Sequence, residues 1–127
     1  MKGVIGLSGP YDFYPFTSDS ARAAFAHVTD PALTQPTHFA RGDAPPMLLL
    51  TGDADTTVKP RNSFALAKAL TAAGLPTAPV VLAGVDHAGP VLKLAQPFMR
   101  DRRVIDPVLA FLAAHGAPSA PVQAAGR

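Results

Sequence analysis

Two short polar loops, each directly after an apolar run, hold the residue types that could do acid–base chemistry. The loop from Gly52 to Val58 contains Asp53 and Asp55, and the loop from Gly84 to Pro90 contains His87. Histidine has the unperturbed side-chain pKa closest to neutrality, which suits a general base. A neighbouring carboxylate can accept a hydrogen bond from Nδ1–H, fix the tautomer and stabilise the ring when it becomes charged. The loops therefore predict the acid and the base of a nucleophile–histidine–acid system, with Asp53 or Asp55 as the acid.

Apolar runs of strand length precede both loops. Met47 to Leu50 follows two prolines and is too short for a buried helix, whereas its length suits a strand covered on both faces. Pro79 to Ala83 begins with proline, which a strand tolerates at its first residue. Val4 to Ser8 is another such run. Because consecutive strands are usually neighbours, we expect the two polar loops to lie side by side at the carboxyl ends of their strands.

Helical patterns separate these runs. The clearest is Arg61 to Ala73, which Gly74 ends, and its apolar stripe consists of Phe64, Leu66, Ala67 and Leu70. Further helices are expected at Ala21 to Val28 behind a Ser18 or Asp19 cap, at Val91 to Phe98 as far as Pro97, and from Arg103 or Val104 to His115. The last should bury Val104, Ile105, Val108, Leu109, Phe111 and Leu112. Strands joined by helical crossovers predict an α/β fold, three-layer, with a parallel sheet of about three strands.

The segments between the first two strands are less regular. Tyr11 to Phe16 is aromatic and flanked by prolines, so its rings either cap the core, which is the more common use, or line a pocket. Asp30-Pro31 predicts a cap and the start of a short helix. Thr34 to Pro46 is expected to be irregular. His27 and His38 could line a pocket there or be solvated, whereas His115 ends a helix, where a partly charged ring suits the dipole.

The composition is that of a globular protein. The chain has 127 residues, enough for one domain with a core, and 48% of them are hydrophobic. The net charge is +2 and most basic residues are scattered, so no nucleic-acid partner is expected. The absence of cysteine excludes disulfides and cysteine zinc sites. No apolar run approaches the ~20 residues of a membrane span, and the amino terminus is weak as a signal peptide, which favours a cytoplasmic location.

Here the motifs resemble those of a known family. The segment from Gly52 to Val58 is similar to the acid loop of α/β-hydrolase esterases, G-x-x-D-x-x-V, and Gly84 to His87 is similar to their histidine loop, G-x-x-H. The helix from Asn62 to Ala73 and the strand that leads into Ser-Gly-Pro-Tyr-Asp also resemble carboxylesterase and lipase-like members. The match runs from about Gly3 to His115. The chain thus resembles the carboxyl-terminal portion of a carboxylesterase-like serine hydrolase.

The resemblance implies roles for the loop residues. Asp55 is the triad acid and His87 the base, whereas Asp53 falls where the family is variable and is expected to be a turn residue. Asp86 is expected to structure the turn before His87. The substrate would be a small-molecule ester, and no cofactor is expected.

The nucleophile of this family is missing from the chain. It belongs in G-x-S-x-G, on a sharp strand-to-helix turn that precedes the acid and the base, and no such motif occurs. Ser8 comes nearest, but Pro10 stands in place of the second glycine and no helical pattern follows. No such turn is predicted at Ser18, Ser20 or Ser63 either. The oxyanion-hole loop is absent too, so the chain alone should hydrolyse little or nothing.

The same sequence allows alternatives to an esterase. A non-catalytic truncated hydrolase fragment could act as a binding module, complement a missing amino-terminal half, or self-associate through an exposed edge at Val4 to Ser8. A flavodoxin-like domain would need more strands and a phosphate-binding glycine loop. A metal site could use the hard ligands Asp53, Asp55, Asp86 and His87, but their spacing within one loop does not support it. We expect residues 1–116 to be the carboxyl-terminal portion of a hydrolase domain and 117–127 a flexible tail.

Overall fold

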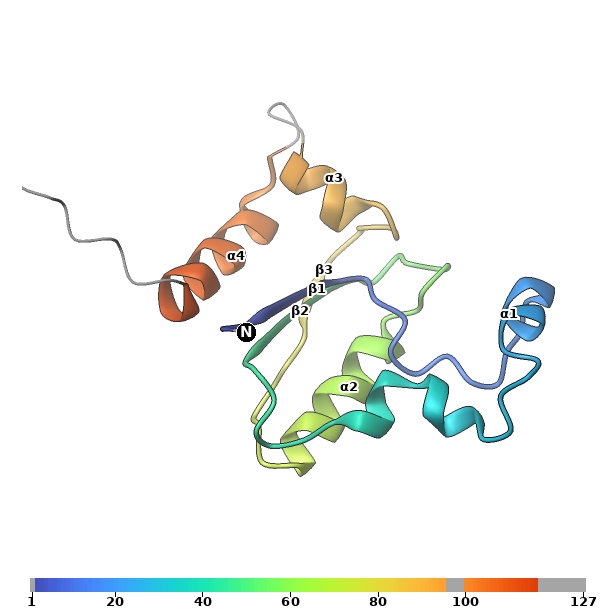
Figure 1. The fold of residues 1–127 in the computed structure, drawn as a ribbon. Helices are drawn as coiled ribbons and strands as arrows, with labels where there is room; N and C mark the ends of the chain where they lie inside the picture. Colours follow the sequence, from blue (N-terminus) through green and yellow to red (C-terminus); the bar gives the residue numbers. More distant parts are fainter. Residues whose placement is uncertain (1, 96–99, 117–127) are drawn as a thin grey trace, which may run out of the picture.

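A parallel three-stranded sheet lies between two layers of helices (Figure 1). The computed structural model describes residues 2–95 and 100–116. The strands are β1 (Val4–Leu7), β2 (Met47–Gly52) and β3 (Val80–Leu82), in the order β1-β2-β3. Val4 lies opposite Met47, and Leu50 lies opposite Val80. The predicted fold class is confirmed, and the predicted strands differ from the observed ones only at their ends.

Each face of the sheet has its own core. On one face, Leu49 packs with residues of α2 (Arg61–Ala72), chiefly Leu66 and Leu70. On the other, Leu50 packs with Val104 of α4 (Arg102–His115), and α3 (Gly89–Ala95) lies in the same layer (Figure 1). Successive strand residues point to opposite faces, so the unbroken apolar run in β2 is required to fill both cores.

The connection from β1 to β2 contains three short helices, α1 (Asp19–Ala24), η1 (Pro31–Thr34) and η2 (Pro36–Phe39). Ser18 caps α1 and Asp30 caps η1 through hydrogen bonds to backbone N–H groups. The prediction that the first helix reaches Val28 is wrong. Because α1 buries none of its residues, no packing extends it, and the chain leaves the helix at Phe25, whose ring joins Phe13 and Phe16. The helix η2 was not predicted.

The later helices begin and end close to the predicted positions. Gly74 follows α2 with a φ of 99°, a left-handed conformation that glycine adopts without strain. α3 is described as far as Ala95. The predicted continuation to Pro97 and the predicted tail at 117–127 fall outside the described residues.

Several side chains that the helical stripes predicted to be buried are exposed. Leu109 and Leu112 of α4 are 58% and 50% exposed, and Phe64 of α2 is 50% exposed. Val104 is the buried residue of α4 within the described part of the chain. The helical period correctly assigned these residues to the apolar face of each helix. The three-stranded sheet, however, is too narrow to cover the whole of that face.

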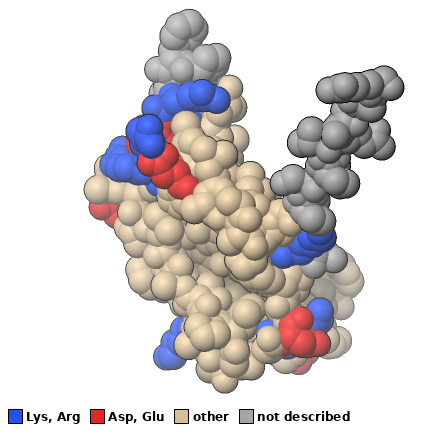
Figure 2. Space-filling view, turned by 90° about the vertical axis from the view of Figure 1, so that its left-hand side faces the viewer, with Lys and Arg blue, Asp and Glu red and all other residues tan. Residues whose placement is uncertain are grey.

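Most charged side chains on the face at which the amino-terminal end of β1 lies are toward its top and bottom, with one further basic group at mid-height on the right (Figure 2). Most of the surface between them is uncharged (Figure 2). Arg102 pairs with Asp106 at 3.1 Å, and Arg41 pairs with Asp43 at 3.0 Å. The positive charge of these arginines is therefore balanced locally.

Substitution of a buried leucine tests the core assignment. Leu70 is 1% exposed, so Leu70→Ala should lower the free energy of unfolding by about 2–5 kcal/mol, because it removes buried contacts and leaves a cavity. Leu109→Ala is the matched control and should change it by less than about 0.5 kcal/mol. Denaturant unfolding followed by circular dichroism measures both. Equal losses for the two variants would contradict this packing.

Candidate active site

The structure brings Asp55 and His87 together. Nδ1 of His87 lies 2.9 Å from Oδ2 of Asp55. The Asp55 side chain is completely buried, whereas the His87 side chain is 43% exposed. The ring nitrogen that faces Asp55 is therefore shielded, and the other nitrogen, Nε2, is the one left to exchange a proton with a substrate.

The environment of Asp55 favours its ionised form. Burial by itself raises the pKa of this carboxyl. The hydrogen bond and charge of His87, together with hydrogen bonds from two backbone N–H groups, lower the pKa by more, and the net shift is downward. The ionised carboxylate accepts a hydrogen bond from Nδ1–H, and in the neutral form of the ring this leaves the lone pair on Nε2.

The acid loop holds Asp55 through its own backbone. The N–H groups of Thr57 and Val58 donate to Asp55 Oδ1 at 2.9 and 2.8 Å. The Asp55 N–H donates to the carbonyl of Gly52 at 3.2 Å. One carboxylate oxygen is thus occupied by the loop and the other by His87.

Gly52 and Asp53 fix how the histidine loop crosses the acid loop. A Cβ at Gly52 would overlap the carbonyl oxygen of Val85, so only glycine fits at this crossing. Asp53 Oδ1 accepts from the Gly84 N–H at 2.7 Å, and the Ala54 N–H donates to the Val85 carbonyl at 3.2 Å. Asp53 therefore ties the two loops together and does not contact His87 through a hydrogen bond.

Asp86 structures the turn that holds His87, but on the side after the histidine rather than before it. Its Oδ1 accepts from the Gly89 N–H at 2.9 Å. The described residues contain no group of three or more histidine, cysteine, aspartate or glutamate side chains that could hold a metal ion. Asp53, Asp55 and Asp86 are instead used separately, each for its own hydrogen bonds.

Ser8 shares one feature with a nucleophile turn but lacks the others. Its φ is 50°, in the left-handed region. Its hydroxyl is buried and has no hydrogen-bond partner within the described residues. A hydroxyl that neither meets His87 nor reaches solvent is not placed to attack a substrate, in line with the sequence argument against Ser8.

The remaining predicted candidates lie away from the Asp55–His87 pair. His27 is exposed, and His38 packs edge-on against Phe39 at a centroid distance of 5.0 Å. His115 packs against Phe111 at 4.7 Å. Ser18 caps α1 and is exposed, as is Ser20, whereas Ser63 is buried in α2.

Two buried amide side chains hold the loop that follows β1, and sequence reasoning missed both. Asn62 Oδ1 accepts from the N–H groups of Tyr11 and Asp12 at 3.0 and 2.8 Å. Gln35 Oε1 accepts from those of Phe13 and Tyr14 at 2.6 and 3.0 Å. The one sequence signal for this role is that Asn62 is a polar residue next to the apolar stripe of its helix.

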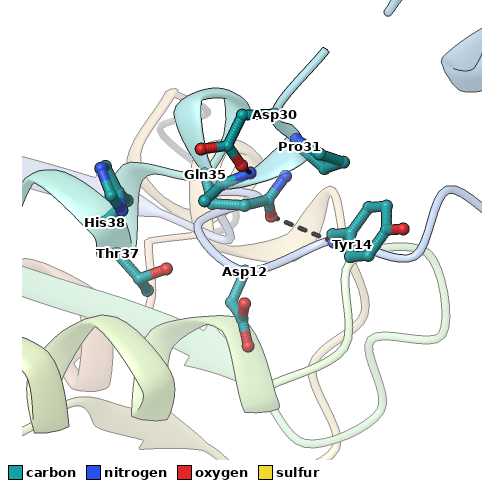
Figure 3. A pocket seen from close by; sticks show the side chains of 8 residues that line it. Asp12, Tyr14, Asp30, Pro31, Gln35, Thr37 and His38 are labelled. Carbon is teal, nitrogen blue, oxygen red and sulfur yellow. Dashed lines mark hydrogen bonds between the residues drawn. The ribbon is translucent and has the colours of Figure 1, made fainter. Parts of the chain in front are cut away.

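A hollow of about 530 Å³ lies beside this loop. Figure 3 shows Gln35 bonded to Tyr14 at its edge, with Asp12, Asp30 and His38 around it. Neither Asp55 nor His87 lines this hollow. A second hollow, of about 240 Å³, lies between the Tyr11–Phe16 segment and the acid loop.

The described part of the chain has no helix long and apolar enough to cross a membrane.

The pKa shift of Asp55 predicts how stability changes with pH. Because the folded pKa lies below the ordinary value, ionised Asp55 stabilises the fold above that ordinary value. This contribution is lost as the pH falls through the folded pKa. The Asp55→Asn variant should therefore lose less unfolding free energy than the parent chain when the pH is lowered from neutral to acid. Denaturant unfolding at each pH measures this loss.

Asp53→Asn is the matched control for this experiment, since its amide oxygen can still accept from Gly84. This variant should keep the steep acid limb of the parent chain. A steep limb that persists unchanged in Asp55→Asn would show that other carboxylates cause it.

Comparison with known proteins agrees with this architecture. The model of the prolyl oligopeptidase family matches residues 18–117. No significant match to a curated protein sequence was found. The thermophilic esterase Est2 of the Planctomycetes species Thermogutta terrifontis, with propionate bound, is 20% identical and superimposes with a TM-score of 0.64 over 94% of this chain. Its apo form is 21% identical, with a TM-score of 0.66 over 92% of this chain.

This chain spans less than half the length of those esterases, covering 45% and 44% of them. At such low identity the likeness shows the fold alone, and it confirms the resemblance to part of an α/β-hydrolase. The family match covers most of the chain and includes both polar loops, Gly52 to Val58 and Gly84 to Pro90. The chain therefore belongs to the prolyl oligopeptidase family, a family of serine hydrolases with the α/β-hydrolase fold.

Proposed function

We propose that this chain supplies the acid and the base of a serine hydrolase that cleaves carboxylic esters. The observation that carries the proposal is the 2.9 Å contact between His87 Nδ1 and the buried Asp55 Oδ2. Both residues follow the carboxyl ends of paired parallel strands, the usual position of active sites in open α/β sheets. The nucleophilic serine and the oxyanion hole would come from polypeptide outside these 127 residues.

The geometry supports a role for each of the two residues. His87 Nε2 would take the proton of the serine hydroxyl as its oxygen attacks the ester carbonyl, and Asp55 would stabilise the resulting imidazolium. His87 would then return that proton to the departing alcohol as the ester C–O bond breaks. Water would repeat the two steps on the acyl-enzyme, releasing the acid and regenerating the serine. Without the serine, His87 could at most activate water, and without the oxyanion hole the developing charge would lack stabilisation.

Peptide bonds are a second class of substrate. The match to the prolyl oligopeptidase family favours them, whereas the similar solved structures are esterases, bound in two cases to propionate or butyrate. Ester and peptide cleavage use the same acid and base. A short-chain ester and a prolyl anilide should therefore both be tested.

The open edge of β1 is where we place the missing part of the domain. Within the described residues β1 pairs with β2 alone. Val4 lines an apolar hollow of about 440 Å³ on the α2 face. Ile5 lines another, of about 210 Å³, on the α4 face, beside the exposed Leu112. A strand added along β1, with a helix on each face, would cover both hollows, as parallel sheets require.

Activity should appear when the missing part is supplied. The reading frame that precedes the codon of Met1 would be sequenced, and a segment encoding G-x-S-x-G would be expressed together with this chain. The pair should hydrolyse 4-nitrophenyl butyrate, and N-blocked glycyl-prolyl 4-nitroanilide tests the peptide alternative. Asp55→Asn and His87→Ala should each lower kcat on the order of 10⁴-fold.

Asp53→Asn is the control and should retain activity, because Asp53 contacts Gly84 and not His87. A correctly assembled pair that hydrolyses neither substrate would favour the alternative, a non-catalytic hydrolase fragment. Equal activity of Asp55→Asn and Asp53→Asn would refute the role of Asp55.

Amide hydrogen exchange tests the docking edge separately. The N–H groups of Val4 and Ser8 donate to the carbonyls of Pro46, just before β2, and Leu50 at 2.9 Å, so by alternation those of Ile5 and Leu7 point to the open edge. In the isolated chain Ile5 and Leu7 should exchange much faster than Val4, and the added segment should slow them. If the added segment leaves the exchange rates of Ile5 and Leu7 unchanged, it docks elsewhere on the chain.

A further inference from the structure

A small hollow between the Tyr11–Phe16 segment and the acid loop has features that no step of the proposed reaction uses. Its volume is about 240 Å³. One wall comes from Pro10, Phe13, Pro15 and Thr17, and the other from the acid loop and the start of α2.

This hollow is connected directly to the Asp55–His87 pair. Thr57 and Val58 line it, and their N–H groups donate to Asp55 Oδ1. The other oxygen of the same carboxylate holds His87. A ligand against this wall would therefore contact residues that bond directly to Asp55, the hydrogen-bond partner of His87.

The charged side chains that line the hollow are both basic, namely Lys59 and Arg61. Arg61 has a carboxylate oxygen of Asp12 at 3.4 Å, which offsets part of its charge, whereas Lys59 makes no ion pair within the described residues. The ionised Asp55 carboxylate lies behind the wall and uses both oxygens for its own loop and for His87. Lys59 is therefore the main source of positive charge beside the apolar surfaces of Phe13 and the prolines.

Asn62 joins the two walls. It is 5% exposed, and its Oδ1 accepts from the N–H groups of Tyr11 and Asp12 on one side. Its Nδ2 donates to the carbonyl of Lys59 on the other side, at 3.1 Å. One buried amide thus fixes the spacing between the walls, so the hollow is built into the fold.

We propose that this hollow binds a carboxylate attached to a small apolar body, such as an aryl or short alkyl group. Lys59 and Arg61 would attract the carboxylate, and Phe13 with the prolines would cover the apolar part. As a substrate subsite this inference rests on the function proposed above, and it would make the substrate an ester or peptide with a negatively charged group.

Binding of phenylacetate to the full chain, followed by the amide signals of a ¹⁵N-labelled sample, tests the proposal without catalysis. Signals of Phe13, Thr57 and Val58 should shift and saturate at roughly millimolar ligand, as expected for so few atoms. Phenylacetamide, which has nearly the same shape without the charge, should bind about two- to fivefold more weakly. Added salt should weaken phenylacetate alone.

Variants separate this site from the catalytic pair. Lys59→Gln and Arg61→Gln should each weaken phenylacetate about two- to fivefold, whereas Lys68→Gln, the matched charge change elsewhere on the surface, should not. His87→Ala should bind as well as the parent, so a failure of the proposed catalysis leaves this result intact. Equal affinity for phenylacetate and phenylacetamide, or shifts confined to other amides, would overturn the proposal.

Discussion

β2 and β3 pair in parallel with Leu50 opposite Val80 and Gly52 opposite Leu82, and the candidate site depends on this register. Both strands end at the same edge of the sheet, so the loops that follow them must cross. They can cross closely only because position 52 has no side chain. A shift of the register by one residue would turn the strand residues to the other face and move Asp55 away from His87.

Around this crossing, buried polar groups are matched to backbone donors. Asp55 uses one oxygen for its own loop and one for His87, while Asn62 and Gln35 accept from successive N–H groups after β1. An unpaired buried donor costs about 1–3 kcal/mol, so these amides allow an irregular loop to pack against the core. The Asp55–His87 pair and the loop after β1 are thus both held by side-chain acceptors matched to backbone donors.

The edge of the sheet formed by β1 is different, because its backbone groups have no strand beside them within the described residues. Within the described residues β1 is paired along one edge, and the exposed Leu109 and Leu112 lie on α4, which packs on one face of this sheet. Parallel sheets are normally buried on both faces and continue until an edge is protected. The chain spans less than half of the esterases that it resembles, and a larger α/β-hydrolase domain would cover these same surfaces.

The amino-acid sequence by itself determined the strands, the order of the elements and the two polar loops. It did so because proline, glycine and apolar runs act on the chain locally, as at Pro45-Pro46 before β2 and Gly74 after α2. It also ranked Asp55 above Asp53 through the spacing of a family motif. Only the tertiary structure decided which oxygens meet which distant donors: Asp53 at Gly84, and Asn62 at the loop after β1. The exposure of Leu109 and Phe64 was likewise decided by the width of the sheet. Such contacts join residues far apart in the chain, so they arise from strand register and helix packing, which local patterns do not encode.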